Sequence, residues 1–220
     1  MRNRFLKISL VISLASISTL GLNGCFPIIA TGMVGSAMVL ADRRPVSVST
    51  IDRGLQLEIE SSITQKFGNS AHVNVNVYNQ KVLLTGEATT ASVRSQIEDE
   101  AKKSKNIKSL ANEIHVGFLS SMSSRVSDSS LYTLIKAKLI ATSDVPSNSM
   151  KIVVEGGRVY LMGLVTPLEA KAATSVVSKS SDSIKEVIAL FDLISEEERA
   201  RLDSQSSKPA ENDNKASPRN

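Results

Sequence analysis

The chain has 220 residues, enough for one or two domains, and 41% of them are hydrophobic but only 4% aromatic, with no Trp. Three of its 26 basic residues, Arg2, Arg4 and Lys7, lie in the first seven positions, so the rest of the chain carries 23 bases against 22 acids. Without a basic field and with few aromatic rings to stack on bases, the composition argues against nucleic-acid binding.

The first 24 residues have the pattern of an export signal. A charged segment, Arg2–Lys7, precedes the apolar stretch Ile8–Leu22, which is short for a membrane span. The segment ends in Leu22-Asn23-Gly24-Cys25, which contains the only cysteine. This tetrapeptide resembles a bacterial lipobox, and the resemblance implies that residues 1–24 are removed and Cys25 is acylated, including with palmitate. The alternative is a signal peptide followed by a chance cysteine.

Residues 25–45 are expected to form a lipidated tether. Positions 27–41 are apolar but small, and Pro27, Gly32 and Gly35 interrupt them, so a spanning helix is excluded. The tether lies either on the membrane or on the body of the protein. Phe26 follows the cysteine where an enteric lipoprotein retained at the inner membrane would have Asp, which favours the outer membrane, with the body in the periplasm.

Most of the remaining chain is a tandem repeat. Val82–Thr89 matches Val159–Thr166, and Asn106–Leu110 matches Ser183–Val187. Each copy predicts the order helix, strand, turn, strand, helix, strand, with an alternating strand at 71–78 and turns at 79–80 and 155–157. Second helices are expected at 90–105 and 167–181, and closing strands at 109–118 and 185–193.

The first helix of the second copy, Ser130–Ala141, is the candidate binding element. Leu131, Ile135 and Leu139 form a core stripe, and Asp128 is placed to cap the helix N-terminus. The residues outside the stripe are mostly small or apolar and are flanked by two lysines. The candidate lipid-binding set is Ser130, Tyr132, Thr133, Leu134, Lys136, Ala137, Lys138, Ile140 and Ala141.

The first copy provides an internal comparison. Residues 52–65 align without gaps on 128–141 and keep the core stripe, but Glu58 stands where the second copy has Leu134, and Thr64 where it has Ile140. An outward apolar strip with flanking cations suits an anionic phospholipid surface. The alternatives are that this face packs on the first copy, on a dimer mate or on another envelope protein, or is merely exposed.

No arrangement typical of an enzyme is visible. His72 and His115 are the only histidines, and no second His or Cys stands at metal-ligand spacing. The carboxylates at 98–100 lie beside Lys102 and Lys103, as on a solvated helix face, and Gly86 and Gly163 lack the pattern of a phosphate-binding loop. We therefore expect no catalysis, no cofactor and no metal, and we expect the two glycines to allow close backbone approach.

The element order, the duplicated V-x-L-x-G-x-x-T and the lipobox together resemble the dual-BON-domain outer-membrane lipoproteins, the group named for division- and outer-membrane-stress-associated lipid binding. The resemblance covers residues 1 to about 195. It implies an α+β fold of two tandem αββαβ BON domains, each a three-stranded mixed sheet packed by two helices. It also implies a location on the periplasmic side of the outer membrane, and anionic-phospholipid binding through the first helix of the second domain. Family members can place an aromatic at the start of that helix, where this chain has Ser130.

The expected organisation is therefore a signal peptide (1–24), a lipidated tether (25–45), BON domain 1 (46–119), a linker (120–127), BON domain 2 (128–195) and a disordered tail (196–220). A turn or two of helix is expected at the start of that tail, over 196–202. The polar linker either joins the domains flexibly or is short enough for them to dock. The sequence predicts one of two functions. The first is an anionic-phospholipid-binding lipoprotein that supports envelope integrity, including at division sites. The alternative is an envelope adaptor that binds a protein through the same helix face.

Overall fold

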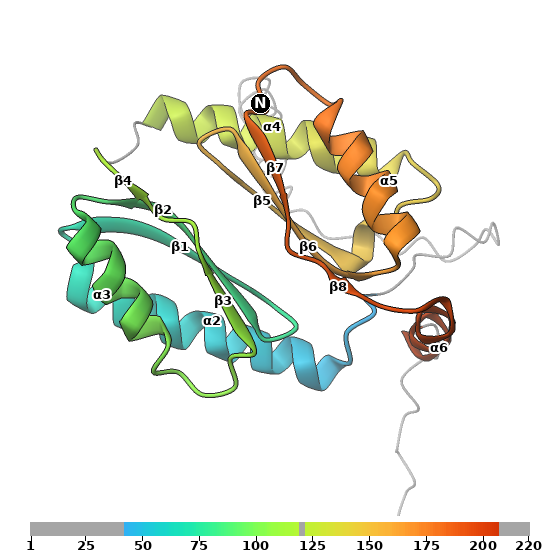
Figure 1. Cartoon of the computed structure of the whole chain (residues 1–220), viewed down its shortest axis with the longest axis horizontal. Coiled ribbons are helices and arrows are strands. Elements are labelled where there is room, and N and C mark those ends of the chain that lie inside the picture. Colours follow the sequence, from blue (N-terminus) through green and yellow to red (C-terminus); the bar gives the residue numbers. More distant parts are fainter. Residues whose placement is uncertain (1–41, 119–121, 207–220) are drawn as a thin grey trace, which may run out of the picture. The chain divides into compact units, whose positions relative to one another are not determined.

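A computed structural model describes residues 42–118 and 122–206 (Figure 1). The predicted signal peptide, Cys25 and nearly all of the tether lie outside these residues. Within the described part, no helix is long and apolar enough to cross a bilayer.

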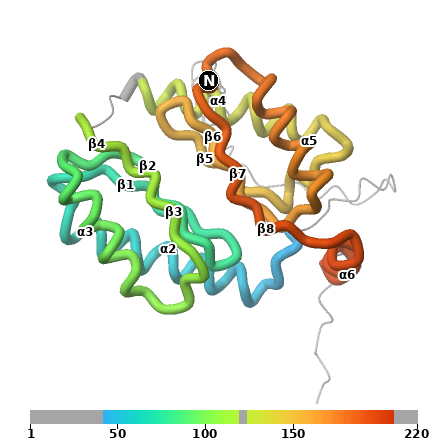
Figure 2. Tube along the Cα trace, viewed as in Figure 1, coloured from blue at the N-terminus to red at the C-terminus, as the bar shows by residue number. Residues whose placement is uncertain are grey.

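The first domain has the predicted order, with its closing strand divided in two. Strand β2 pairs antiparallel with β1 and parallel with β3 and β4, and so lies in the middle of the sheet (Figure 2). Helices α2 and α3 cover the same face of this sheet (Figure 1). The elements are α2 (Val46–Phe67), β1 (Ala71–Tyr78), β2 (Lys81–Ala88), α3 (Ala91–Ala101), β3 (Ser109–Asn112) and β4 (His115–Val116).

The second domain repeats this arrangement around β6, which pairs antiparallel with β5 and parallel with β7 and β8. Its second helix begins with a capping box between Thr166 and Glu169 and has Pro167 in the first turn. The elements are α4 (Met122–Ile140), the 3₁₀ turn η1 (Ser147–Ser149), β5 (Met150–Glu155), β6 (Arg158–Val165), α5 (Pro167–Ser178), β7 (Glu186–Ala189) and β8 (Asp192–Leu193). The two mixed sheets confirm the predicted α+β class.

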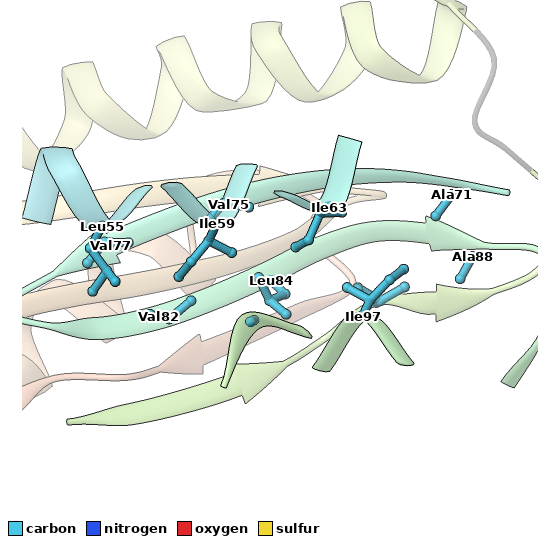
Figure 3. Close-up of a cluster of buried hydrophobic side chains, with 12 residues drawn as sticks. Leu55, Ile59, Ile63, Ala71, Val75, Val77, Val82, Leu84, Ala88 and Ile97 are labelled. Carbon is cyan, nitrogen blue, oxygen red and sulfur yellow. The ribbon is translucent and has the colours of Figure 1, made fainter. Parts of the chain in front are cut away.

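Each domain has an apolar core between its helices and one face of its sheet. In the first, Leu55, Ile59 and Ile63 of α2 meet the strand residues Val75 and Leu84 (Figure 3). In the second, the predicted stripe Leu131, Ile135 and Leu139 is buried in the equivalent way. A fully buried aliphatic side chain stabilises a fold by about 1.5–3 kcal/mol, so these stripes hold the first helices to the sheets.

The opposite faces of the two sheets contribute to a third cluster, which consists of Tyr78, Leu83, Tyr160 and Met162. The hydroxyl of Tyr78 also donates to the carbonyl oxygen of Ser149 at 2.7 Å. An ion pair joins Lys81 to Asp192 at 2.9 Å. The two domains are therefore in contact and not merely linked by a flexible segment.

Two domain boundaries differ from the prediction. Helix α4 begins at Met122, so most of the expected linker 120–127 is helical. These residues lack apolar periodicity, but extending an existing helix avoids the cost of nucleation, and polar residues suffice for it.

The expected disordered tail is also partly structured, because Glu196–Ser206 forms helix α6. Leu202 of this helix is buried, and Asp203 accepts a hydrogen bond from Nε of Arg43 at 2.7 Å. Arg43, with a side chain only 1% exposed, also pairs with Glu169 at 2.7 Å. The sequence predicted only a turn or two of helix before disorder, because these partners lie far away along the chain. Residues 207–220 lie outside the described part.

Glycine at the end of β2 permits close backbone approach, as predicted. Gly86 has a φ of +109°, and a Cβ atom there would lie 2.1 Å from the carbonyl oxygen of His72. At the equivalent position of β6, a Cβ on Gly163 would lie 2.8 Å from the carbonyl oxygen of Ser149. Both glycines thus serve strand pairing.

Candidate functional site

Asp128 does not cap the N-terminus of α4, because the helix starts six residues earlier. Its carboxylate instead accepts hydrogen bonds from the backbone N–H groups of Gly156 and Gly157, at 2.8 and 2.9 Å. These glycines form the β5–β6 turn with positive φ angles of 59° and 79°. Asp128 therefore joins α4 to the hairpin that it packs against, and so fixes which face of the helix points outward.

The first domain uses the same device. The carboxylate of Asp52 in α2 accepts from the N–H groups of Asn79 and Gln80, both at 2.7 Å. Both turn residues have positive φ, at 51° and 65°, which is unusual for residues other than glycine. The matched carboxylates show that the two first helices are seated in the same rotation, so their outward faces can be compared position by position.

Outside its core stripe, α4 exposes large apolar side chains. Tyr132 is 42% exposed, Leu134 41% and Ile140 61%. Leu134 and Ile140 therefore do not pack on the first domain, which was one of the alternatives. Of the remaining candidates, Ser130, Thr133, Ala137, Lys138 and Ala141 are exposed, and Lys136 is half-buried on the flank that also carries Tyr132.

Val126 is a member of this surface that the sequence did not predict. Val126 is 63% exposed and lies in the first part of α4, which was expected to be linker. At 100° per residue it projects from the side of the helix that also carries Thr133 and Ala137. Its exposure on this side of the helix follows only once α4 is known to begin at Met122. We call Val126, Leu134, Ala137, Ile140 and Ala141 the apolar strip.

Helix α2 is more polar at the matched positions, although it is not free of exposed apolar groups. Glu58, Glu60 and Thr64 replace Leu134, Lys136 and Ile140, but Leu57 is 49% exposed and Ile51 39%. The two helices therefore differ in the charge of their outward faces and in how many apolar side chains those faces expose. The difference is smaller than the sequence suggested.

The two lysines of α4 are partly engaged inside their own domain. The ammonium of Lys136 donates to the carbonyl oxygen of Ser147 at 2.7 Å, and that of Lys138 to Ser180 at 3.0 Å. Burial lowers the pKa of Lys136. Each ammonium has three N–H donors, so both retain capacity for an anion, but neither is the freely extended charge that the sequence suggested.

A hollow of about 520 Å³ lies beside Leu134. It is lined by hydroxyl groups of α4 and of the segment after α5, by Gly156 and Gly157, and by Lys185. Among the described residues, no group of three His, Cys, Asp or Glu side chains is placed to hold a metal ion. The surface combines the apolar strip with hydroxyl and ammonium groups at its side.

Comparison with known proteins identifies the repeated unit. Residues 56–117 and 127–194 each match the BON domain. The chain is 30% identical over 176 residues to outer membrane lipoprotein DolP of Haemophilus influenzae, covering 79% of this chain and 91% of that protein. It is 29% identical over 155 residues to a 21 kDa hemolysin of Actinobacillus pleuropneumoniae, covering 70% and 79%. The chain therefore belongs to the BON domain family, among the dual-BON outer-membrane lipoproteins.

Among solved structures, CdsD, a structural protein of the type III secretion system of Chlamydia trachomatis, is 14% identical and covers 71% of this chain and 99% of its own. The TM-score is 0.28, too low to bear on fold or function.

Proposed function

We propose that this protein is anchored to the outer membrane through Cys25, faces the periplasm, and binds anionic phospholipid through α4 of its second BON domain. In this role it supports envelope integrity, including at division sites. The observation that carries the proposal is the exposure of Val126, Leu134 and Ile140 on one side of a helix whose only acidic residue, Asp128, is occupied by the β5–β6 turn. The likeness to an outer membrane lipoprotein supports the location.

The energies favour a weak contact that depends on the anchor. Apolar side chains of this size contribute about 1.5–3 kcal/mol each when fully buried, and less when partly buried at an interface. A lysine near an anionic surface contributes about 1 kcal/mol, and Lys136 and Lys138 contribute less because each already donates to a carbonyl. Acyl anchoring would supply the effective concentration that so weak a contact needs.

Vesicle binding by a chain lacking residues 1–25 tests the proposal. This chain should bind phosphatidylglycerol vesicles, bind phosphatidylcholine vesicles much more weakly, and lose affinity as salt is raised. Leu134→Glu should abolish binding, because it places a carboxylate in the apolar strip. The matched control is Leu57→Glu, the same change at an exposed leucine of the sister helix, and it should bind as the wild type does.

Two results would count against the proposal. If the chain binds neither kind of vesicle while a specific envelope protein binds α4 and is lost in Leu134→Glu, the adaptor function takes its place. If Leu57→Glu is as damaging as Leu134→Glu, the contact is not specific to the second domain.

A further inference from the structure

A second hollow, of about 400 Å³, lies on the other flank of α4. Its walls come from α2 and β1 of the first domain and from α4 and β5 of the second. Tyr132 and Lys136 of α4 line it, whereas Leu134 does not. This hollow is therefore separate from the apolar strip.

Basic groups outnumber acidic groups around this hollow by four to two. The basic residues are Arg44, Arg53, Lys136 and Lys151, and the acidic residues are Asp42 and Asp52. Both carboxylates are already occupied: Asp52 by the β1–β2 turn and by Arg44, and Asp42 by Arg44. Because Arg44 is shared by both carboxylates, the six groups carry a net charge of +2, and the remaining cations are Arg53 and the two lysines.

Within the described part of the chain, neither Lys136 nor Lys151 forms an ion pair with a carboxylate. Their ammonium groups contact carbonyl oxygens instead, of Ser147 at 2.7 Å and of Val77 at 3.4 Å. Burial, together with the charge of Arg44, lowers the pKa of Lys151 to about 8. Holding two cations in a partly desolvated hollow costs stability, which favours the view that an anion completes the site.

The repeat provides an internal comparison here too. The gap-free helix alignment places Glu60 at the position of Lys136. The register of the hairpins places Asn74, four residues before the end of β1, at the position of Lys151. Glu60 and Asn74 line a different hollow, which also contains Asp128 and Glu155. Both lysines are thus particular to the second domain, since the first has an acidic residue at one of these positions and a neutral residue at the other.

We propose that the hollow between α2, α4 and β5 binds a phosphate group. A phosphate presents several acceptor oxygens in different directions, which suits a hollow lined by ammonium groups from separate elements and by the amide of Gln56. The ring of Tyr132 lies at the same hollow and gives an apolar surface for the carbon part of a phosphate ester. The hollow shares Tyr132 and Lys136 with the candidate lipid-binding set, but no residue of the apolar strip lines it.

Two sources share this chemistry: the headgroup of a phospholipid and a soluble phosphate. The chain lacking residues 1–25 retains the whole described unit and can be titrated with glycerophosphoglycerol, a phosphodiester headgroup without acyl chains, and separately with inorganic phosphate. Amide chemical shifts and the melting temperature report binding. Tighter binding of the diester indicates the lipid headgroup as the source, and tighter binding of inorganic phosphate indicates a soluble ligand.

Lys151→Met is the decisive variant, because it keeps the length of the side chain and removes the charge from a half-buried position. It should raise the dissociation constant at least tenfold, which corresponds to about 1.4 kcal/mol, and remove the stabilisation by ligand, because the phosphate loses a charged hydrogen-bond donor. Lys171→Met, at an exposed lysine of α5, is the matched control and should change neither.

The proposal is overturned if neither probe shifts amides around the hollow at millimolar concentration, or if folded Lys151→Met binds as well as the wild type. Leu134→Glu should leave both titrations unchanged, so a failure of vesicle binding and a failure of this site can be told apart.

Discussion

At the scale of single residues, Asp128 shows how one carboxylate can set the orientation of a binding helix. It occupies two backbone N–H groups of the β5–β6 turn, at 2.8 and 2.9 Å. Asp128→Asn keeps the shape but replaces two charge-assisted hydrogen bonds with at most weaker ones. We expect a loss of about 1–3 kcal/mol in the free energy of unfolding, measured by urea denaturation followed by circular dichroism.

The control is Asp144→Asn, at an exposed position between α4 and η1, which should change stability by no more than about 0.5 kcal/mol. Equal losses in the two variants would show that the carboxylate of Asp128 does not hold the turn.

We expect the free energy of unfolding to depend on pH through Lys151. The lowered pKa of Lys151 decides whether stability rises or falls with pH. Groups facing it include Arg44 and Arg53, which repel its charge, and Asp52, which attracts it. The folded state releases the proton near pH 8 and the unfolded state near 10.5, so the unfolded state binds more protons between these values. The cost of the buried charge is therefore present at pH 7 and is relieved as the pH rises.

Comparison with Lys151→Met isolates this effect from other titrating groups. At pH 7 the variant should be more stable than the wild type by about 1–3 kcal/mol, since one pKa unit corresponds to about 1.4 kcal/mol. By pH 10 the difference should shrink. A difference that stays constant from pH 7 to 10 in denaturation experiments would contradict the assignment.

At the scale of elements, periodicity and turn chemistry predicted most of the fold. The core stripes of α2 and α4 follow from apolar spacing, and the turns at Asn79–Gln80 and Gly156–Gly157 from their residue types. The start of α4 could not be predicted, because residues 122–127 are mostly polar and have no apolar stripe. The role of Asp128 was also missed, since a carboxylate before an apolar helix suggests a local cap and its partners lie 28 and 29 residues away.

Only part of the candidate site could be predicted, because the start of α4 was not. Leu134 and Ile140 followed from comparison with α2, whereas Val126 needed the true start of the helix. Lysine side chains are long enough to reach several acceptors, so sequence could not show that Lys136 and Lys138 bind carbonyl oxygens of Ser147 and Ser180.

Val126 gives a prediction specific to the structure. If the apolar strip extends over the first turns of α4, Val126→Glu should weaken binding to phosphatidylglycerol vesicles at least severalfold, because it introduces a negative charge and removes an apolar contact. Cosedimentation measures this directly. The control Ser127→Glu adds the same charge on the adjacent helix position, and a larger effect there than at Val126 would argue against an apolar contact at this end of the helix.

At the scale of the whole molecule, Arg43 connects the start of the described chain to its last helix. The guanidinium lies between Glu169 and Asp203, and it donates to the carbonyl oxygen of Leu164 at 3.0 Å. Sixteen residues, 26–41, separate Asp42 from the predicted anchor at Cys25. A chain of this length spans at most about 55 Å when extended. Arg43 therefore fixes the end of the described chain to which the predicted tether would be joined.

Truncation tests this connection. Removing residues 196–220 deletes Leu202 and Asp203 and leaves a buried arginine with one carboxylate partner, so we expect a loss of about 2–4 kcal/mol in the free energy of unfolding. Removing residues 207–220 leaves α6 intact and should change stability little. If both truncated chains unfold at the same urea concentration, α6 does not stabilise the body through Arg43.

The most direct test of the proposed membrane contact is a measurement of which helix enters the bilayer. The chain lacking residues 1–25, bound to phosphatidylglycerol bicelles that carry a spin label on the acyl chain, would be followed by the broadening of its amide signals. We predict selective broadening along α4 around Val126, Leu134 and Ile140, with the matched positions of α2 unaffected. Equal broadening of both helices, or broadening of neither in the bound state, would contradict the assignment of α4 as the lipid-binding helix.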